Sequence, residues 1–154
     1  MKTIFGTFAA GRVAVGLLIF RLLFGLGMAL HGYQKLISPG GAFGWADPGL
    51  GFAIPPAFQG LATLAELGGG IAIMVGFVTP LAALGILTTM GFAIVKFHWG
   101  VRHAHYVAVT PGPDYEAAAH YFIMALVLLV SGPGSISLDA LFFGRRFRGP
   151  AQVP

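Results

Sequence analysis

Two long apolar segments constrain the fold of this chain more than any other feature. The first runs from Val13 to about Gly32 and contains one charge, Arg21, while the second runs from Phe58 to Phe97 and contains only Glu66 and Lys96. A helix needs about 20 apolar residues to cross the roughly 30 Å hydrocarbon core of a bilayer, so the second segment is too long for one crossing. The chain is therefore predicted to lie in a membrane and to cross it several times.

The second apolar segment is expected to divide at Thr79-Pro80, because threonine caps helix N-termini and proline is favoured at the first helical position. A last apolar segment begins at Pro113-Asp114 and stops at Gly132-Pro133-Gly134. We predict a single domain over residues 1–154: an all-α membrane protein, a four-transmembrane-helix bundle with a short C-terminal interfacial helix. The predicted spans cover residues 13–32, 58–78, 80–97 and 114–131, and the interfacial helix covers residues 137–147.

Composition agrees with this prediction and excludes several functions. Only 9% of the residues are charged, against roughly 25% in soluble domains. The net charge of +4 is spread over segment ends without a basic face, so we expect no nucleic-acid binding. The chain has no cysteine, which excludes a disulfide, a CxxC redox pair or a thiolate metal site within it. Redox chemistry would therefore need a bound cofactor or a partner.

The positive residues near the span ends predict the orientation. The first apolar segment is longer than the apolar core of a signal peptide, so we expect it to be retained as a span. Lysine and arginine are retained preferentially on the cytoplasmic side. Five lie on the side of the termini (Lys2, Arg12, Arg145, Arg146, Arg148) and three on the loop side (Lys35, Lys96, Arg102). Both termini are predicted to be cytoplasmic, in a bacterial or archaeal-type inner (plasma) membrane.

Arg21 and Glu66 are the charges that fall inside predicted spans. An ionisable group there is expensive unless it is paired or solvated within the bundle. A rise of 1.5 Å per residue places Arg21 roughly 16 Å and Glu66 roughly 12 Å below the loop-side surface, within reach of a long arginine side chain. We therefore expect a buried ion pair, which either fixes helix register or lines a substrate or proton site.

Further polar groups crowd the loop-side half of the predicted bundle, where they could form one cavity above this pair. We take Glu66, Arg21 and His31 as candidate catalytic residues. Candidate cofactor-binding residues are Gln34, Lys35, His120 and His98.

Metal and haem sites are less favoured than an organic cofactor. His103 and His105, with His98 upstream, match no closed ligand set, so no metal site is expected. A haem between His31 and His120 is possible in principle but less favoured, because histidines near span ends more often hydrogen-bond at the interface.

Several segments together resemble the DoxX family of small four-helix membrane proteins. They are RLLFG from Arg21, HGYQKL from His31, ELGGG from Glu66, GFVTP from Gly76, and GPG from Gly132 followed by Ser137-Leu138-Asp139. The resemblance implies a four-helix bundle with a link to membrane redox work, since the family takes its name from a subunit of a thiosulfate:quinone oxidoreductase and has members tied to oxidative-stress complexes.

Three functions are compatible with these observations. The first is a quinone-linked oxidoreductase or its membrane subunit, in which His31 or Lys35 holds a quinone carbonyl and Glu66 exchanges a proton. The others are a non-enzymatic membrane scaffold and a transporter of a small solute or protons. The expected partners are the lipid bilayer, a soluble redox protein and a second copy of the chain.

Overall fold

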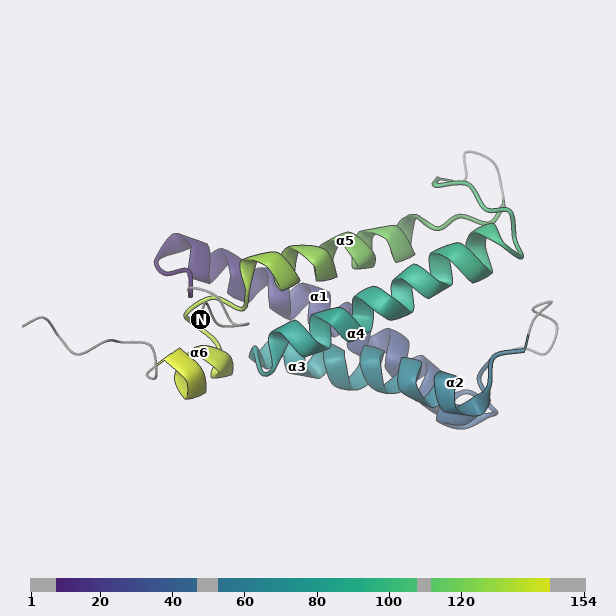
Figure 1. The fold of residues 1–154 in the computed structure, drawn as a ribbon, viewed down its shortest axis with the longest axis horizontal. Coiled ribbons are helices and arrows are strands. Elements are labelled where there is room, and N and C mark those ends of the chain that lie inside the picture. Colours follow the sequence, from purple (N-terminus) through teal and green to yellow (C-terminus); the bar gives the residue numbers. More distant parts are fainter. Residues whose placement is uncertain (1–7, 47–52, 108–111, 145–154) are drawn as a thin grey trace, which may run out of the picture.

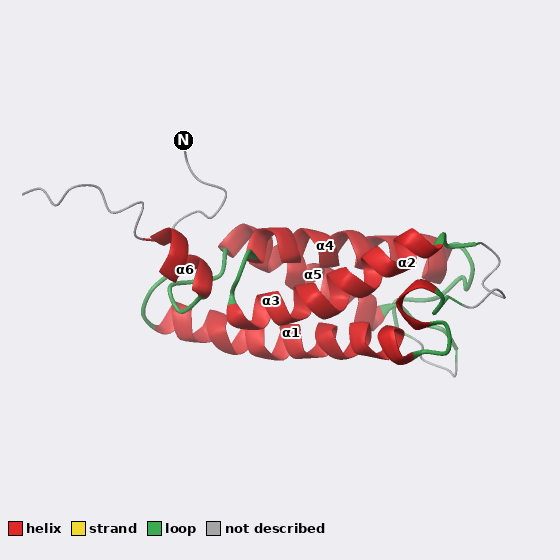
Figure 2. Ribbon diagram, turned by 90° about the horizontal axis from the view of Figure 1, so that it is seen from below, coloured by secondary structure: helices red, strands yellow, loops and turns green. Residues whose placement is uncertain are grey.

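The structure is a computed structural model that describes residues 8–46, 53–107 and 112–144. Within these residues it is all-helical and contains no strand, which confirms the predicted fold class. Four helical rods run along the long axis of the molecule, and a short helix lies at one end (Figures 1 and 2). The rods are α1 (Arg12–Ile37); α2 (Pro56–Thr63) continuing through η3 (Leu64–Gly68) into α3 (Gly69–Val75); α4 (Thr79–Phe92) continuing into η4 (Ala93–Trp99); and α5 (Glu116–Ser131).

Three rods are long and apolar enough to cross a membrane, and the fourth is apolar but shorter. They have 26 residues in Arg12–Ile37, 20 in Pro56–Val75 and 21 in Thr79–Trp99, whereas α5 has 16. The first is longer than the predicted span, because its helix continues past Gly32 through the polar residues to Ile37.

A helix break lies before Pro80 as expected, but the predicted capping by Thr79 is wrong, because Val78 is the N-cap residue and Thr79 is already the first residue of the helix. The turn before it contains two residues with left-handed backbone, Gly76 (φ 68°) and Val78 (φ 43°). The new helix then begins at Thr79 with Pro80 in its first turn, where the missing peptide N–H of proline is tolerated.

The C-terminal helix α6 (Leu138–Phe143) begins one residue after the predicted start. The hydroxyl of Ser137 caps it by accepting a hydrogen bond from the peptide N–H of Ala140, 3.1 Å away. It lies beside the turn that joins the end of α3 to the start of α4, at the end of the molecule where α1 begins (Figure 1). Residues 145–147 of the predicted helix, and the charges Lys2, Arg145, Arg146 and Arg148 used to predict orientation, lie outside the described residues.

Small residues bring α1 and α3 into backbone contact. A Cβ at Gly25 would lie 2.5 Å from the carbonyl oxygen of Gly70, and a Cβ at Gly70 would lie 2.7 Å from that of Gly25. About two turns further along α1, a Cβ at Gly32 would clash with the backbone of Leu67. Close approach through glycine is the usual way in which membrane helices gain packing energy, because lipid supplies no hydrophobic force between them.

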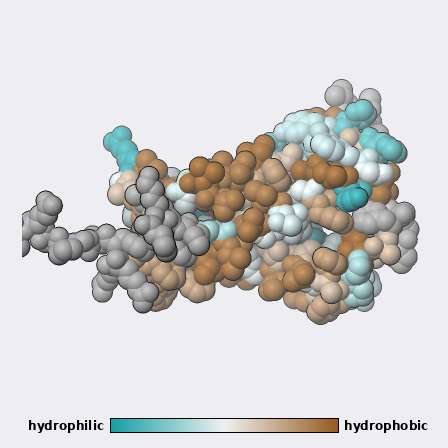
Figure 3. Space-filling model, viewed as in Figure 1, coloured by the Kyte–Doolittle hydropathy of each residue, from teal (hydrophilic) through white to brown (hydrophobic). Residues whose placement is uncertain are grey.

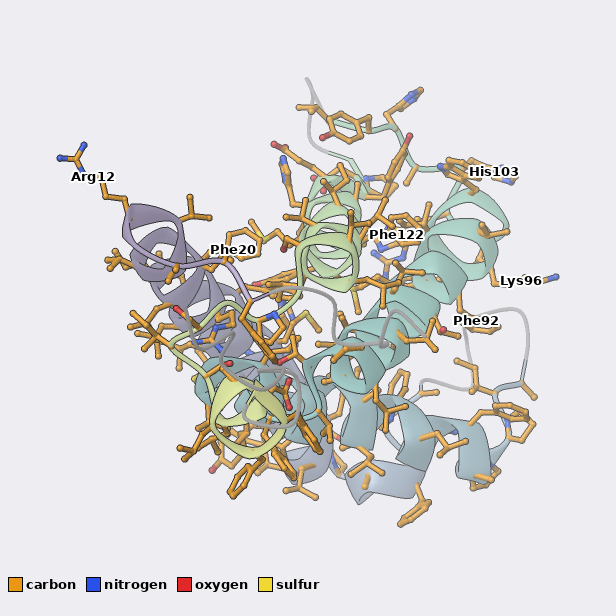
Figure 4. The ribbon with its side chains drawn as sticks, turned by 60° about the vertical axis from the view of Figure 1, so that its left-hand side comes forward. Arg12, Phe20, Phe92, Lys96, His103 and Phe122 are labelled. Atoms are coloured by element: carbon orange, nitrogen blue, oxygen red, sulfur yellow. The ribbon has the colours of Figure 1, made fainter. Side chains whose placement is uncertain are left out.

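The other helices pack through larger side chains. α4 lies mainly against α5, where Phe122 fits beside Gly91. Phe20 and Phe122 both lie among the helices in Figure 4, and each packs against the central apolar cluster. The fully buried members of that cluster include Met28, Ile73 and Leu128.

The outer surface is apolar in the middle and polar at the loop end. Large apolar side chains are more than two-thirds exposed on three rods, at Leu23, Leu81 and Val130. In Figure 3 such residues cover the middle of the visible face, and hydrophilic residues gather toward the loops. Arg12 and Lys96 point away from the bundle at its opposite ends (Figure 4). This distribution fits a lipid environment around the rods.

Candidate functional site

The central feature of the candidate site is a buried ion pair between Glu66 and Lys35. Glu66 lies on η3, and its side chain is 1% exposed; Lys35 lies near the end of α1 and is 22% exposed. The Lys35 Nζ lies 2.5 Å from Glu66 Oε1. In the described part of the chain the Glu66 side chain forms no other hydrogen bond, and its Oε2 atom is buried without a partner.

Glu66 lies in a π-helical turn. Residues Leu64–Gly68 form i→i+5 hydrogen bonds between two α-helical stretches of the same rod. Such a turn holds one more residue than an α-turn, which displaces its side chains relative to the regular helix, and π-turns are frequent at functional sites. A second π-helical segment, η4, ends the next rod at its loop side.

Trp45 covers the lysine of this pair. Its ring centroid lies 4.3 Å from Lys35 Nζ, a cation–π contact that stabilises a partly desolvated ammonium. Its indole N–H donates to the carbonyl oxygen of Gln59 at 3.1 Å. The Lys35–Glu66 pair is thus bounded on one side by an ordered aromatic ring.

The Gln59 side chain holds the backbone next to Trp45 and the backbone just before α2. Its side-chain oxygen accepts from the peptide N–H of Ala46 at 2.9 Å, and its side-chain nitrogen donates to the carbonyl oxygen of Ile54 at 2.8 Å. The Thr63 hydroxyl lies one turn further along and contacts Ala42 and Gln59. Trp45 and Gln59 were not among the predicted site residues. The sequence did mark Gln59, because it is a glutamine near the start of an apolar span.

The predicted ion pair between Arg21 and Glu66 is wrong. Arg21 is fully buried, but its Nη2 donates to the carbonyl oxygen of Ile136. The acidic group whose charge acts on it is Asp139. Its guanidinium lies against Gly76, ten residues along the rod from Glu66, or about 15 Å at 1.5 Å per residue.

Side-chain direction explains this error. Side chains on a helix incline toward its N-terminus. Because the first two rods are antiparallel, Arg21 reaches toward the chain termini while Glu66 reaches toward the loops. The same rule brings Lys35 back toward Glu66. Asp139, the actual acidic neighbour of Arg21, was visible in the sequence as an isolated acid in an apolar tail.

His31 and Gln34, two other predicted site residues, are not part of the Lys35–Glu66 pair. His31 is exposed and meets the ring of Tyr121 edge-on, with centroids 5.3 Å apart. Gln34 is exposed on α1. The structure thus gathers Lys35 and Glu66, while His31 faces α5 through Tyr121.

The other two predicted histidines, His98 and His120, lie on η4 and α5. His98 is half-buried on η4, with its ring centroid 6.5 Å from that of Tyr115. Its Nδ1 atom is buried and has no hydrogen-bond partner within residues 8–46, 53–107 and 112–144. His120 on α5 is exposed, 6.3 Å from the ring of Tyr106. The α4–α5 branch and α2 diverge toward the loop end in Figure 1. His98 and His120 therefore lie on different helices from the Lys35–Glu66 pair. The single cavity that was predicted above an Arg21–Glu66 pair is not formed by the described residues.

Among the described residues no group of three or more His, Cys, Asp or Glu side chains is placed to hold a metal ion. His103 and His105 are exposed in the loop after η4.

The amino-acid sequence is similar to that of known membrane proteins. The family model DoxX matches residues 16–99, which include Arg21, Lys35 and Glu66. The chain is 32% identical over 136 residues to the inner membrane protein YphA of Escherichia coli (strain K12), an alignment that covers 86% of this chain and 93% of that protein. No solved structure matches. With more than half of its length matched by the family model, and a relative similar over nearly the whole chain, the protein belongs to the DoxX family of membrane proteins.

Proposed function

We propose that this protein is the quinone-binding membrane subunit of a redox system, and that the quinone binds beside the Lys35–Glu66 pair. The observation that carries the proposal is the state of Glu66: one carboxyl oxygen is paired with Lys35, and the other is buried without a partner. A buried carboxyl group with a free oxygen is suited to exchange a proton with a ligand that enters from lipid.

The chemistry assigns a distinct role to each side chain. Reduction of a quinone to a quinol takes up two electrons and two protons. The Lys35 ammonium would donate a hydrogen bond to a quinone carbonyl. Glu66, when protonated, would pass one proton to the oxygen that gains charge and, after taking up another proton from the loop-side water, would pass the second. The two electrons would come from a partner redox protein.

The position of the pair suits a ligand with a polar ring and an apolar tail. Lys35 lies two residues before the end of α1, so the pair lies toward the loop-side end of the hydrocarbon region. Trp45 supplies an aromatic face there for a planar ring. Leu36 and Leu64, both exposed on the two rods that carry the pair, provide apolar surface for the tail.

Tryptophan fluorescence tests the proposal directly. The chain has two tryptophans, so a Trp99→Phe background leaves Trp45 as the reporter. We expect saturable quenching when a short-tailed quinone is added to the protein in lipid nanodiscs. Glu66→Gln and Lys35→Met should each weaken binding by about tenfold, equivalent to roughly 1.4 kcal/mol.

The matched control is Lys96→Met, which removes an exposed lysine from η4 and should leave the binding curve unchanged. Quenching that is unsaturable, or identical in all variants, would contradict quinone binding at this pair. A scaffold would keep its partner-recruiting activity in the Glu66 and Lys35 variants. A proton transporter would instead acidify proteoliposomes without any quinone.

A further inference from the structure

Asp139 of α6 is buried against the start of another helix. Its side chain is fully buried. Its Oδ1 accepts from the peptide N–H of Val78 at 2.7 Å, and its Oδ2 accepts from that of Thr79 at 2.9 Å. These groups begin α4, a helix of 14 residues, whose unpaired N–H groups and dipole favour an anion at this end.

Arg21 adds a buried positive charge to the same place. It is fully buried, and among the described residues its Nη2 has a partner, the carbonyl oxygen of Ile136, while its Nε and Nη1 have none. The charge of Asp139 acts on this guanidinium. The hydroxyl oxygen of Thr79 is also buried, with no hydrogen-bond partner in the part of the chain that the structure describes. The donors at this position therefore outnumber the acceptors that contact them.

Gly76 shows that these donors converge. It has left-handed backbone, with φ 68°, and a Cβ at this position would collide with Arg21 Nη1 and with Ser137. The guanidinium thus lies directly against the turn that supplies the Val78 and Thr79 N–H groups. The peptide N–H of Asp139 also donates to the carbonyl oxygen of Gly76 at 2.8 Å, which fixes α6 at this turn.

We infer that Arg21 and the first peptide N–H groups of α4 form a carboxylate-binding site, and that α6 is its tethered ligand through Asp139. The site is separate from the Lys35–Glu66 pair and does not depend on quinone binding. The docking of the C-terminal helix onto the bundle is thus an anion-binding event within one chain. When the Asp139 side chain is shortened, the site is left open to a free carboxylate of similar size.

Chemical rescue of the full-length Asp139→Ala variant tests this inference. We expect a lower Tm in detergent than for the wild type, and recovery of at least half of that loss on adding sodium formate or acetate. Sodium chloride at the same ionic strength should give no recovery. The Arg21→Met/Asp139→Ala double variant should show no difference between formate and chloride.

The matched control is Asp114→Ala, which removes an exposed carboxylate and should respond equally to all three salts. Equal recovery by chloride, or recovery by formate without Arg21, would overturn the inference. If Asp139→Ala does not fold, its yield of monodisperse protein purified in formate or in chloride gives the same comparison. A higher yield in formate supports the site, and equal yields overturn it.

Discussion

At the scale of single residues, each of the two buried charges within the spans has its own partner. Glu66 meets Lys35 at the loop end, and Arg21 meets the α6 segment at the other end. Breaking a buried pair from one side leaves an uncompensated charge, which destabilises far more than removing both members. The two ends of the bundle should therefore respond independently to substitution.

For the loop-end pair, we expect Lys35→Met to lower the free energy of unfolding by about 3–5 kcal/mol, because it leaves the Glu66 carboxylate buried and unpaired. The double variant Lys35→Met/Glu66→Gln should regain most of that loss. Reversible unfolding in mixed micelles measures both. Strictly additive effects of the two substitutions would show that the side chains are not coupled.

The glycines of α1 offer a second residue-level test. Gly32→Ala should destabilise by about 1–3 kcal/mol, because the new Cβ collides with the backbone of Leu67. Gly16 on the same helix has nothing within 4 Å of such a Cβ. Gly16→Ala should thus be neutral or stabilise by up to about 1 kcal/mol. Equal Tm values for the two variants would contradict the close packing of α1 on α3.

At the scale of elements, helix positions were predictable from the sequence, while their internal geometry was not. The charge-poor segments and the Thr79-Pro80 signal predict the rods to within a few residues, except at the end of α1. The π-turn at Leu64–Gly68 leaves no compositional signal, because it is a choice of hydrogen-bond partner along a continuous helix.

The candidate site could be predicted only in part, because its ion pairs depend on the three-dimensional arrangement of the helices. Depth along the spans identified Glu66 and Arg21 as unusual, and Lys35 became a candidate through the polar cluster and the HGYQKL segment at the end of the first span. Partner choice, however, depends on side-chain direction and on where α6 returns to the bundle. That return is a long-range contact, so neither spacing nor composition reveals Asp139 as the acidic neighbour of Arg21.

The π-turn itself gives an element-level prediction. Deleting Leu64, whose side chain is 66% exposed, should convert the π-turn to an α-turn and keep both flanking α-helices in register. Glu66 would then rotate away from Lys35, so we expect a folded protein that no longer binds quinone in the fluorescence assay. Leu64→Ala is the control, because it removes the same apolar surface but keeps the π-turn, and it should retain the binding that the deletion variant loses. Normal binding by the deletion variant would show that the π-turn is not needed.

At the scale of the whole molecule, the antiparallel rods place α6 and the start of α1 at one end and the longer loops at the other (Figure 2). The excess of lysine and arginine near the termini predicts that this end faces the cytoplasm. A fluorescent protein that folds only in the cytoplasm should therefore fluoresce when it is fused after Pro154. A periplasmic phosphatase fused there should be inactive. The opposite pattern would reverse the orientation of the Lys35–Glu66 pair across the membrane.

The unequal rods also affect the surrounding lipid. At 1.5 Å per residue α1 measures about 39 Å, whereas α5 measures about 24 Å, shorter than the roughly 30 Å of an average hydrocarbon core. Acyl chains beside α5 must shorten or splay to cover it, and those beside α1 need not. The protein would thus impose a gradient of bilayer thickness around its perimeter, and lipids with short or unsaturated tails would collect along one flank.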